Sequence, residues 1–214
     1  YILPQNVVRI SEQELLNAAC CNLSESFETN PAIDVNHSDA ITGTKQINML
    51  GLKSPYILIT EENVPMVRGA SQTYGLGFTP GPWIESIQVT KGMGSVINGF
   101  ESIVGQINTE LKKPLTDIPL LLNLFNSNNG RVELNTQVKS IVSEKISTSF
   151  FAHYNKRDQS NDKNSDSFLD KPLQSQINLI NRWQYTNAVK GLVSFFNIRV
   201  LDDLKKIGQI GSQY

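Results

Sequence analysis

Apolar and polar residues alternate through much of the second half of the chain. The alternation is strict over residues 131–139, where one face of the predicted strand carries Val132, Leu134, Thr136 and Val138 and the other carries charges and amides. The same period recurs more loosely in three later segments, at residues 146–154, 176–185 and 189–200. This half of the chain is therefore predicted to consist of β-strands.

Short and long connections separate these strands. Asn128-Asn129-Gly130 is a hairpin signal, and Asn187-Ala188 indicates a tight reversal. Residues 155–172, in contrast, form a long and highly charged loop that must lie in water. Strands of this length and period are typical of a transmembrane β-barrel, but a soluble antiparallel sandwich alternates in the same way. Period alone does not separate the two.

The first half is predicted to contain short helices and short strands. A strand at residues 7–10 leads into Ser11-x-x-Glu14, a capping box that starts a helix over residues 12–19. Asn22-Leu-Ser-Glu25 repeats the device and predicts a second helix of about two turns. Strands are then expected in four segments, at residues 33–35, 45–52, 56–60 and 84–114, the last divided into strands at 87–90, 96–97 and 106–111. Glycines at positions 92, 94, 99 and 105 mark the turns between these strands, because glycine readily adopts positive φ values.

The stretch 84–114 resembles the C-terminal part of the plug domain of TonB-dependent outer-membrane receptors. That pattern has an Ile-Glu strand, a glycine turn, a Ser/Val-x-x-Gly step and a closing strand that ends in Lys-x-Pro. The matching segments here are Ile84-Glu85, Lys91-Gly92, Ser95-Val96-Ile97-Asn98-Gly99, Gly105-Gln106-Ile107-Asn108 and Lys112-Lys113-Pro114. Gln106 departs from the pattern, which has a second glycine there, and Glu61-Glu62-Asn63 replaces its usual Asp-Gly turn, although Asn63 can supply a left-handed position.

The resemblance implies an α+β plug, with short helices on a small mixed sheet, over residues 1–114. Antiparallel strands of an incomplete transmembrane β-barrel, the first four or five, would follow over residues 115–214. Gly92, Gly99, Gly105 and Asn108 are the structural residues of the plug motif. Because the chain opens on Tyr1 and stops at Tyr214 without a closing feature, we expect it to be a fragment.

A loop over residues 66–83 is the candidate ligand-binding element. It is long, rich in glycine and proline, and loops of this kind in compact domains are usually functional or mobile. In the family, loops at this position rise towards the extracellular mouth, which makes candidates of Arg68, Gln72, Tyr74, Phe78 and Trp83. The alternative is a loop that only wedges the plug against a barrel wall.

Composition excludes several other functions. A net charge of −1 and the lack of a basic stripe argue against nucleic-acid binding. No apolar run reaches 18 residues, so no membrane-spanning helix is predicted. The two histidines, His37 and His153, have no partner at a metal or triad spacing, and no cofactor motif is complete, so we do not expect an enzyme or a cofactor.

Adjacent cysteines at positions 20 and 21 allow two interpretations. Their Cα atoms, about 3.8 Å apart, lie below the usual range for a disulfide. Together they could bind a soft metal such as copper(I), with Met49, Met66 or Met93 as further ligands. Alternatively they pack as small buried apolar residues, which is the commoner role of free cysteine.

By resemblance, the parent protein resides in the bacterial outer membrane, in contact with its lipid, and imports a scarce ligand. The ligand, a metal chelate, haem or similar, would bind outside and reach the periplasm through force from TonB, acting on a box that would lie upstream of Tyr1. Two alternatives remain open: a plugged-barrel scaffold subunit of an outer-membrane assembly, and a soluble periplasmic or surface β-domain.

Overall fold

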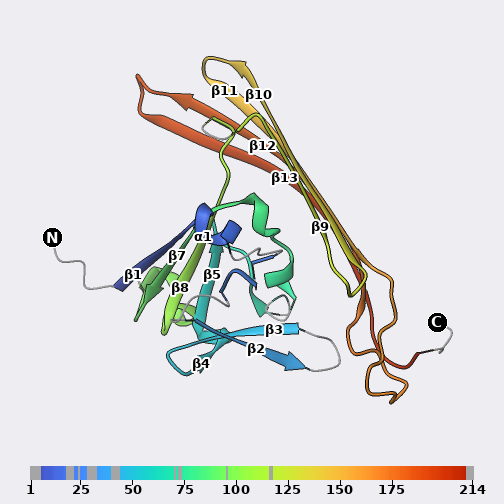
Figure 1. Ribbon diagram of the computed structural model, residues 1–214. Helices are drawn as coiled ribbons and strands as arrows, with labels where there is room; N and C mark the ends of the chain where they lie inside the picture. The colour runs from blue at the N-terminus through green and yellow to red at the C-terminus, as the bar shows by residue number, and fades with distance from the viewer. Residues whose placement is uncertain are drawn as a thin grey trace. The chain divides into compact units, whose positions relative to one another are not determined.

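The computed structural model describes residues 6–17, 22–23, 25–27, 33–39, 44–69, 71, 74–94, 96–115 and 118–210. These residues divide into two compact units, with the boundary between Lys112 and Lys113 (Figure 1). The N-terminal unit holds short strands and helical turns, and the C-terminal unit holds long strands. The fold class predicted from the sequence is confirmed.

A five-stranded mixed sheet forms the centre of the N-terminal unit. Its order is β1-β7-β8-β5-β6, with bounds Asn6–Ser11, Ile84–Lys91, Gly105–Leu111, Ile57–Glu61 and Val64–Pro65. β5 and β8 run parallel, and the other neighbours are antiparallel. β8 therefore lies between an antiparallel and a parallel partner, and its side chains Ile107 and Leu111 are almost completely buried.

A second, three-stranded sheet completes the unit. It pairs β2 (Ile33–Asp39) with β3 (Thr44–Met49), and β3 with β4 (Leu52–Lys53). Leu50 and Gly51 have φ values of 52° and 80°, so both central residues of the β3–β4 turn are left-handed. One apolar cluster joins the two sheets, with members that include Ile33, Ile47 and Met49 from the small sheet and Ile57, Ile87 and Ile107 from the large one.

The predicted capping box is present at the start of α1 (Glu12–Asn17). The Ser11 backbone N–H donates to Glu14 Oε2 at 2.7 Å, and the Glu14 N–H donates back to Ser11 Oγ at 3.4 Å. The hydrogen bonds from Ser11 lower the pKa of the Glu14 carboxyl. The second capping pair is also made, since the Glu25 N–H donates to Asn22 Oδ1 at 3.2 Å.

Three predicted elements differ from the structure. The strand predicted at residues 45–52 is divided into β3 and β4 by the turn at Leu50 and Gly51. The second helix is a single 3-10 turn, η1 (Glu25–Phe27), in the described residues, because this segment is held by local bonds to Asn22 and by a bridge between Asn22 and Pro80. The strand predicted at residues 96–97 is another 3-10 turn, η6 (Val96–Asn98). The Gly99 N–H donates to the Val96 carbonyl at 3.1 Å, and Gly99 has a φ of 70° that ends the turn.

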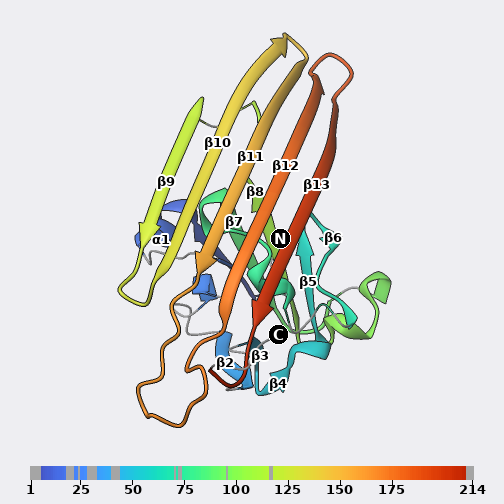
Figure 2. The same cartoon turned by 90° about the vertical axis from the view of Figure 1, so that its right-hand side faces the viewer.

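Five antiparallel strands in sequence order form the C-terminal unit (Figure 2). They are β9 (Leu120–Asn126), β10 (Arg131–Ser143), β11 (Ile146–Arg157), β12 (Leu173–Asn187) and β13 (Leu192–Lys206). The last four were predicted from the sequence and are confirmed, each longer than expected. β9 was not predicted, because its run Leu-Leu-Leu-Asn-Leu-Phe-Asn has leucine on both faces and hides the period of two.

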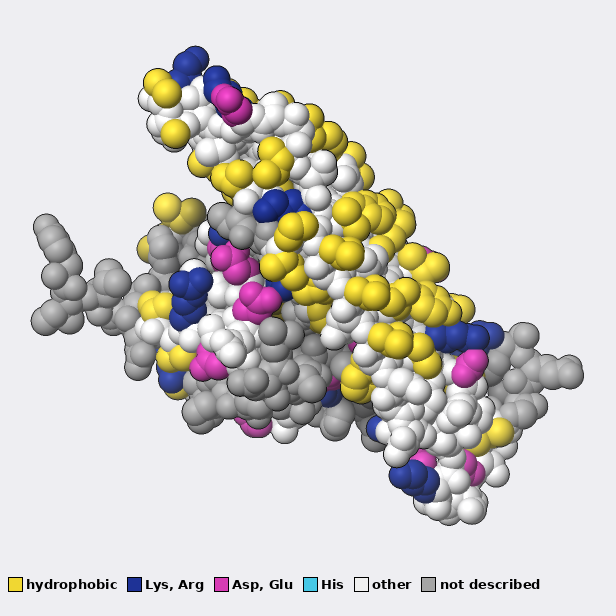
Figure 3. All heavy atoms as spheres, turned by 45° about the horizontal axis from the view of Figure 1, so that its top comes forward, with side chains coloured by type: hydrophobic (Ala, Val, Ile, Leu, Met, Phe, Trp, Pro, Cys, Tyr) yellow, Lys and Arg dark blue, Asp and Glu magenta, His cyan; other side chains and the backbone are white. Residues whose placement is uncertain are grey.

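This sheet buries its polar face and exposes its apolar face. Glu133, Asn135 and Gln137 on β10 are at most 1% exposed, whereas the intervening Leu134 and Val138 are 40% and 48% exposed. Figure 3 shows hydrophobic side chains spread over the outer surface of these strands. Further exposed apolar residues on the same face are Leu122, Leu124, Phe150, Ile177, Trp183, Phe196, Ile198 and Val200. A soluble domain with one shared core would bury these residues instead.

The turns and the long loop between these strands lie where the sequence predicted them. Gly130 has a φ of 71° in the predicted β9–β10 hairpin, and the Gly130 N–H donates to the Ser127 carbonyl. The reversal predicted at residues 187–188 is a turn that ends at Gly191, with a φ of 62°. The long loop between β11 and β12 is exposed and carries its own hydrogen bonds, including two from backbone N–H groups to Asp162. Among the described residues, no helix has the length and apolarity needed to cross a bilayer.

Replacing Gly105 by alanine should destabilise the N-terminal unit by about 1–3 kcal/mol. The added methyl would lie 2.5 Å from the Thr90 carbonyl oxygen and 2.6 Å from Met49 Sδ, both in the packed interior. Gly77→Ala is the matched control, because a Cβ there meets no atom within 4 Å. Guanidinium titration in a Trp183→Phe background would isolate the fluorescence of Trp83, the other of the two tryptophans. Equal midpoints for the two alanine variants would contradict this packing.

Candidate ligand-binding loop

The candidate loop begins at a turn that β8 holds in place. Glu62 and Asn63 have φ values of 55° and 62°, which confirms the left-handed position expected at Asn63. Asn108 Oδ1 accepts hydrogen bonds from Thr60 Oγ1 and from the Asn63 backbone N–H, both at 2.8 Å. Asn108, a residue of the plug motif, therefore fixes the turn from which the loop departs.

Local hydrogen bonds shape the first part of the loop. The Met66 N–H donates to the Ile59 carbonyl, so the chain continues alongside β5. The Arg68 N–H donates to Ser71 Oγ at 2.9 Å, and the Ser71 hydroxyl donates to the Arg68 carbonyl at 2.7 Å. Because these bonds close a short turn, Arg68 has a defined backbone conformation.

The second part consists of two 3-10 turns, η4 (Gly75–Gly77) and η5 (Gly81–Trp83). A Cβ at Gly75 would lie 3.0 Å from the Val67 methyl groups, so the chain packs closely there. Thr79 Oγ1 donates to Glu61 Oε2 at 3.0 Å, and the Leu23 N–H donates to the Thr79 carbonyl. The loop is therefore attached to the sheet at several points along its length.

Arg68 makes an ion pair that sequence reasoning did not anticipate. Its Nε donates to Glu101 Oε2 at 2.7 Å, and Glu101 lies in a different loop, on η7 (Phe100–Ser102). The Arg68 side chain is 54% exposed and the Glu101 side chain 11%. Glu101 raises the pKa of the Arg68 guanidinium through this hydrogen bond and its charge. A lone acidic residue 33 positions away carries no sequence signal for such a contact.

The five candidate residues occupy different environments. Tyr74 is 42% exposed and Phe78 is half-buried, and both lie beside η4. Trp83 is completely buried, and its backbone carbonyl accepts the Lys112 N–H at 3.0 Å, so it does not present its ring to a ligand in this conformation. Gln72 lies outside the described residues. Arg68 is thus the exposed charged group of the set.

The glycines predicted as structural residues of the plug motif have the following geometry. Gly92 and Gly99 have φ values of 95° and 70°, and Gly105 is enclosed by Thr90 and Met49. Cys20 and Cys21 lie outside the described residues. Within the described part of the chain, no group of three or more His, Cys, Asp or Glu residues could hold a metal. Met49 is buried and Met93 is 76% exposed.

Several solved structures share this fold. The ferric-catecholate import receptor Fiu from E. coli K12 is 14% identical, with a TM-score of 0.71, over 95% of this chain and 28% of that receptor. The siderophore receptor PirA from Acinetobacter baumannii is 19% identical, with a TM-score of 0.70, over 93% of this chain and 32% of PirA. The siderophore receptor PirA from Pseudomonas aeruginosa is 18% identical, with a TM-score of 0.65, over 95% and 36%. The chain thus spans about a third of each receptor or less.

No curated protein sequence matches the chain. One family model does, the TonB-dependent receptor plug domain, over residues 2–106. That range contains the candidate loop, the Asn63 turn and the mixed sheet up to the first two residues of β8, and the long strands of the C-terminal unit have the fold of the receptors named above. The chain therefore belongs to the TonB-dependent receptors, as a plug domain followed by barrel strands.

Proposed function

We propose that the intact protein is an outer-membrane receptor that binds a metal chelate outside the cell and imports it through force transmitted by TonB. The observation that carries the proposal is the plug domain over residues 2–106, joined to a sheet that exposes its apolar face. A plug has a role only inside a barrel, and an exposed apolar sheet face is stable in lipid. The solved relatives are described as siderophore or ferric-catecholate receptors, which supports a metal chelate as cargo.

Transport of this kind needs no reacting group in the protein. The chain supplies a folded plug, a half-exposed guanidinium at Arg68, and aromatic side chains at Tyr74 and Phe78 in the same loop. Arginine binds anionic oxygens bidentately, and Tyr and Phe provide apolar contact area. We propose that Arg68, Tyr74 and Phe78 form the part of the ligand site that the plug contributes. Energy would enter as displacement of the plug by TonB.

Uptake by intact cells tests import. Cells that lack the protein should accumulate an iron-labelled ferric chelate only to the level seen in cells whose proton gradient has been dissipated. Deletion of TonB should abolish accumulation but leave binding to the cell surface, because ligand capture precedes the energised step. Accumulation that is unchanged in both strains would instead favour a plugged barrel that serves as a scaffold.

The outer face of β13 provides a test of membrane contact. Val200 is 61% exposed and lies opposite Leu179 on the apolar face, whereas Leu201 lies opposite Asn178 on the polar face. Val200→Arg should destabilise the protein in lipid vesicles by about 2–4 kcal/mol, as charges on the lipid face of barrels do near the midplane. Leu201→Arg is the matched control and should cost clearly less. Guanidinium titration of the vesicle-embedded protein measures both, and equal losses would argue against a lipid-facing Val200.

A further inference from the structure

The candidate loop is attached to two different parts of the N-terminal unit. Its first half, residues 66–69, follows β5, because the Met66 N–H donates to the Ile59 carbonyl at 3.1 Å. Its second half, residues 74–83, is attached to the segment that comes after β1. We call this segment the N-terminal segment, and its described residues are 12–17, 22–23 and 25–27.

Backbone contacts join the second half of the loop to the N-terminal segment. The Leu23 N–H donates to the Thr79 carbonyl at 3.0 Å, and Asn22 and Pro80 form an isolated antiparallel bridge. The helix α1 also contacts η5, the last turn of the loop. Because a backbone hydrogen bond fixes the distance between two chains, the second half of the loop must follow the N-terminal segment when that segment moves.

Lys112 fastens the end of the loop to the same segment. Its backbone N–H donates to the Trp83 carbonyl at 3.0 Å, and its Nζ donates to Glu12 Oε1 at 2.6 Å. The Lys112 side chain is 2% exposed, whereas that of Glu12 is 44% exposed. A buried ammonium group needs its carboxylate partner, so the positions of Glu12 and Trp83 both depend on this one residue.

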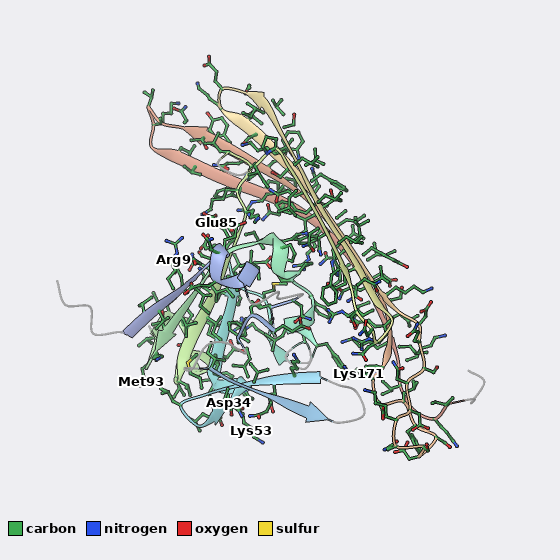
Figure 4. All side chains as sticks on the ribbon, in the orientation of Figure 1. Arg9, Asp34, Lys53, Glu85, Met93 and Lys171 are labelled. Atoms are coloured by element: carbon green, nitrogen blue, oxygen red, sulfur yellow. The ribbon has the colours of Figure 1, made fainter. Side chains whose placement is uncertain are left out.

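These contacts lie at one end of the central sheet. Ser11, directly before α1, pairs with Ser86, and Leu111, near the end of the unit, pairs with Ile84. Figure 4 shows Glu85, which lies between these two pairs, next to α1, and α1 contacts β7. The start of α1, the end of the candidate loop and the end of β8 therefore meet in one place.

Side-chain contacts join the two halves of the loop to each other and to β5. Thr79 Oγ1 donates to Glu61 Oε2 at 3.0 Å, so the Thr79 side chain bonds β5 while its carbonyl bonds the N-terminal segment. A Cβ at Gly75 would lie 3.0 Å from the Val67 methyl groups, so the halves pack together there. Contacts made by side chains can break without disturbing the pairing of the strands, so the loop can divide between Val67 and Gly75.

We propose that the candidate loop is a divided element: its first half stays with β5, its second half moves with the N-terminal segment, and Lys112 is the positioning residue that couples them. Displacement of the N-terminal segment would then separate Tyr74 and Phe78 from Arg68. The role of these three side chains in ligand binding rests on the proposed function, whereas the division of the loop does not. A ligand held by both halves would lose part of its plug contacts as the plug opens.

Hydrogen–deuterium exchange of the intact purified protein, measured by mass spectrometry on peptic peptides, tests the division. Glu12→Gln should raise amide exchange in residues 74–83 about tenfold, because the coupling through Lys112 is lost. Residues 64–69 and 105–111 should exchange at the wild-type rate. Lys112→Met removes the buried charge itself and should give the same pattern, so an effect of the unpaired ammonium group alone is separated from the loss of coupling.

Two further variants complete the comparison. Lys53→Met replaces an exposed lysine on β4, which Figure 4 shows far from α1, and should leave exchange unchanged in every peptide. Thr79→Val removes the hydroxyl that bonds Glu61 but keeps the Thr79 carbonyl for Leu23. It should therefore raise exchange in the second half of the loop less than Glu12→Gln does.

The pattern of exchange separates the alternatives. A rise in the second half of the loop alone, in both Glu12→Gln and Lys112→Met, supports the divided loop. No rise there, or a rise spread equally over both halves, overturns it. A larger effect of Thr79→Val also overturns it, because the second half would then follow β5. These readings need no ligand, so a failed uptake experiment would count against the proposed function and leave the exchange result standing.

Discussion

The parallel pairing of β5 with β8 is the contact on which the N-terminal unit depends. It joins Ile57–Glu61 to Gly105–Leu111, segments more than 40 residues apart, and places Asn108 beside Thr60 and the Asn63 turn. Because β8 also pairs with β7, the same strand sets where the β7–β8 loop begins relative to β5. The meeting of Arg68 and Glu101 follows from this register, and a slip of one residue would turn Asn108 to the other face of the sheet.

The C-terminal unit depends on a different constraint: one face of its sheet is buried and polar, and the other face is exposed and apolar. Within β11, buried His153 bonds through Nδ1 to Asn135 Oδ1 at 2.7 Å, while the adjacent Tyr154 is 38% exposed. Arg182 on β12 is fully buried and lies 4.7 Å from the centre of the Phe195 ring. Polar and charged side chains thus gather on the buried face, which is the inverse of a water-soluble sheet and suits a barrel with a polar interior.

Much of this architecture was predictable because the signals are local. Capping at Ser11 and Asn22, the left-handed Asn63 and the hairpin at Gly130 each need only a few neighbouring residues. The 3-10 turn at Val96 and the ion pair of Arg68 were not predictable, since the first depends on whether a neighbouring strand is available and the second on the packing of two distant loops. Trp83 shows the same limit, because an aromatic residue in a Gly/Pro-rich loop can equally be exposed or, as here, buried.

Lys112, the last residue of the N-terminal unit, is 2% exposed in its side chain and binds Glu12 Oε1 at 2.6 Å. This ion pair joins positions 100 residues apart, so the unit is fastened where its chain starts α1 and where it leaves β8. Removing the segment before α1 together with Glu12 would leave the buried Lys112 ammonium group without this ion-pair partner. An uncompensated buried charge is strongly destabilising. A force that pulls on the amino-terminal side of this unit is therefore passed through the Glu12–Lys112 ion pair to the end of β8. Unfolding beyond α1 requires that this ion pair break.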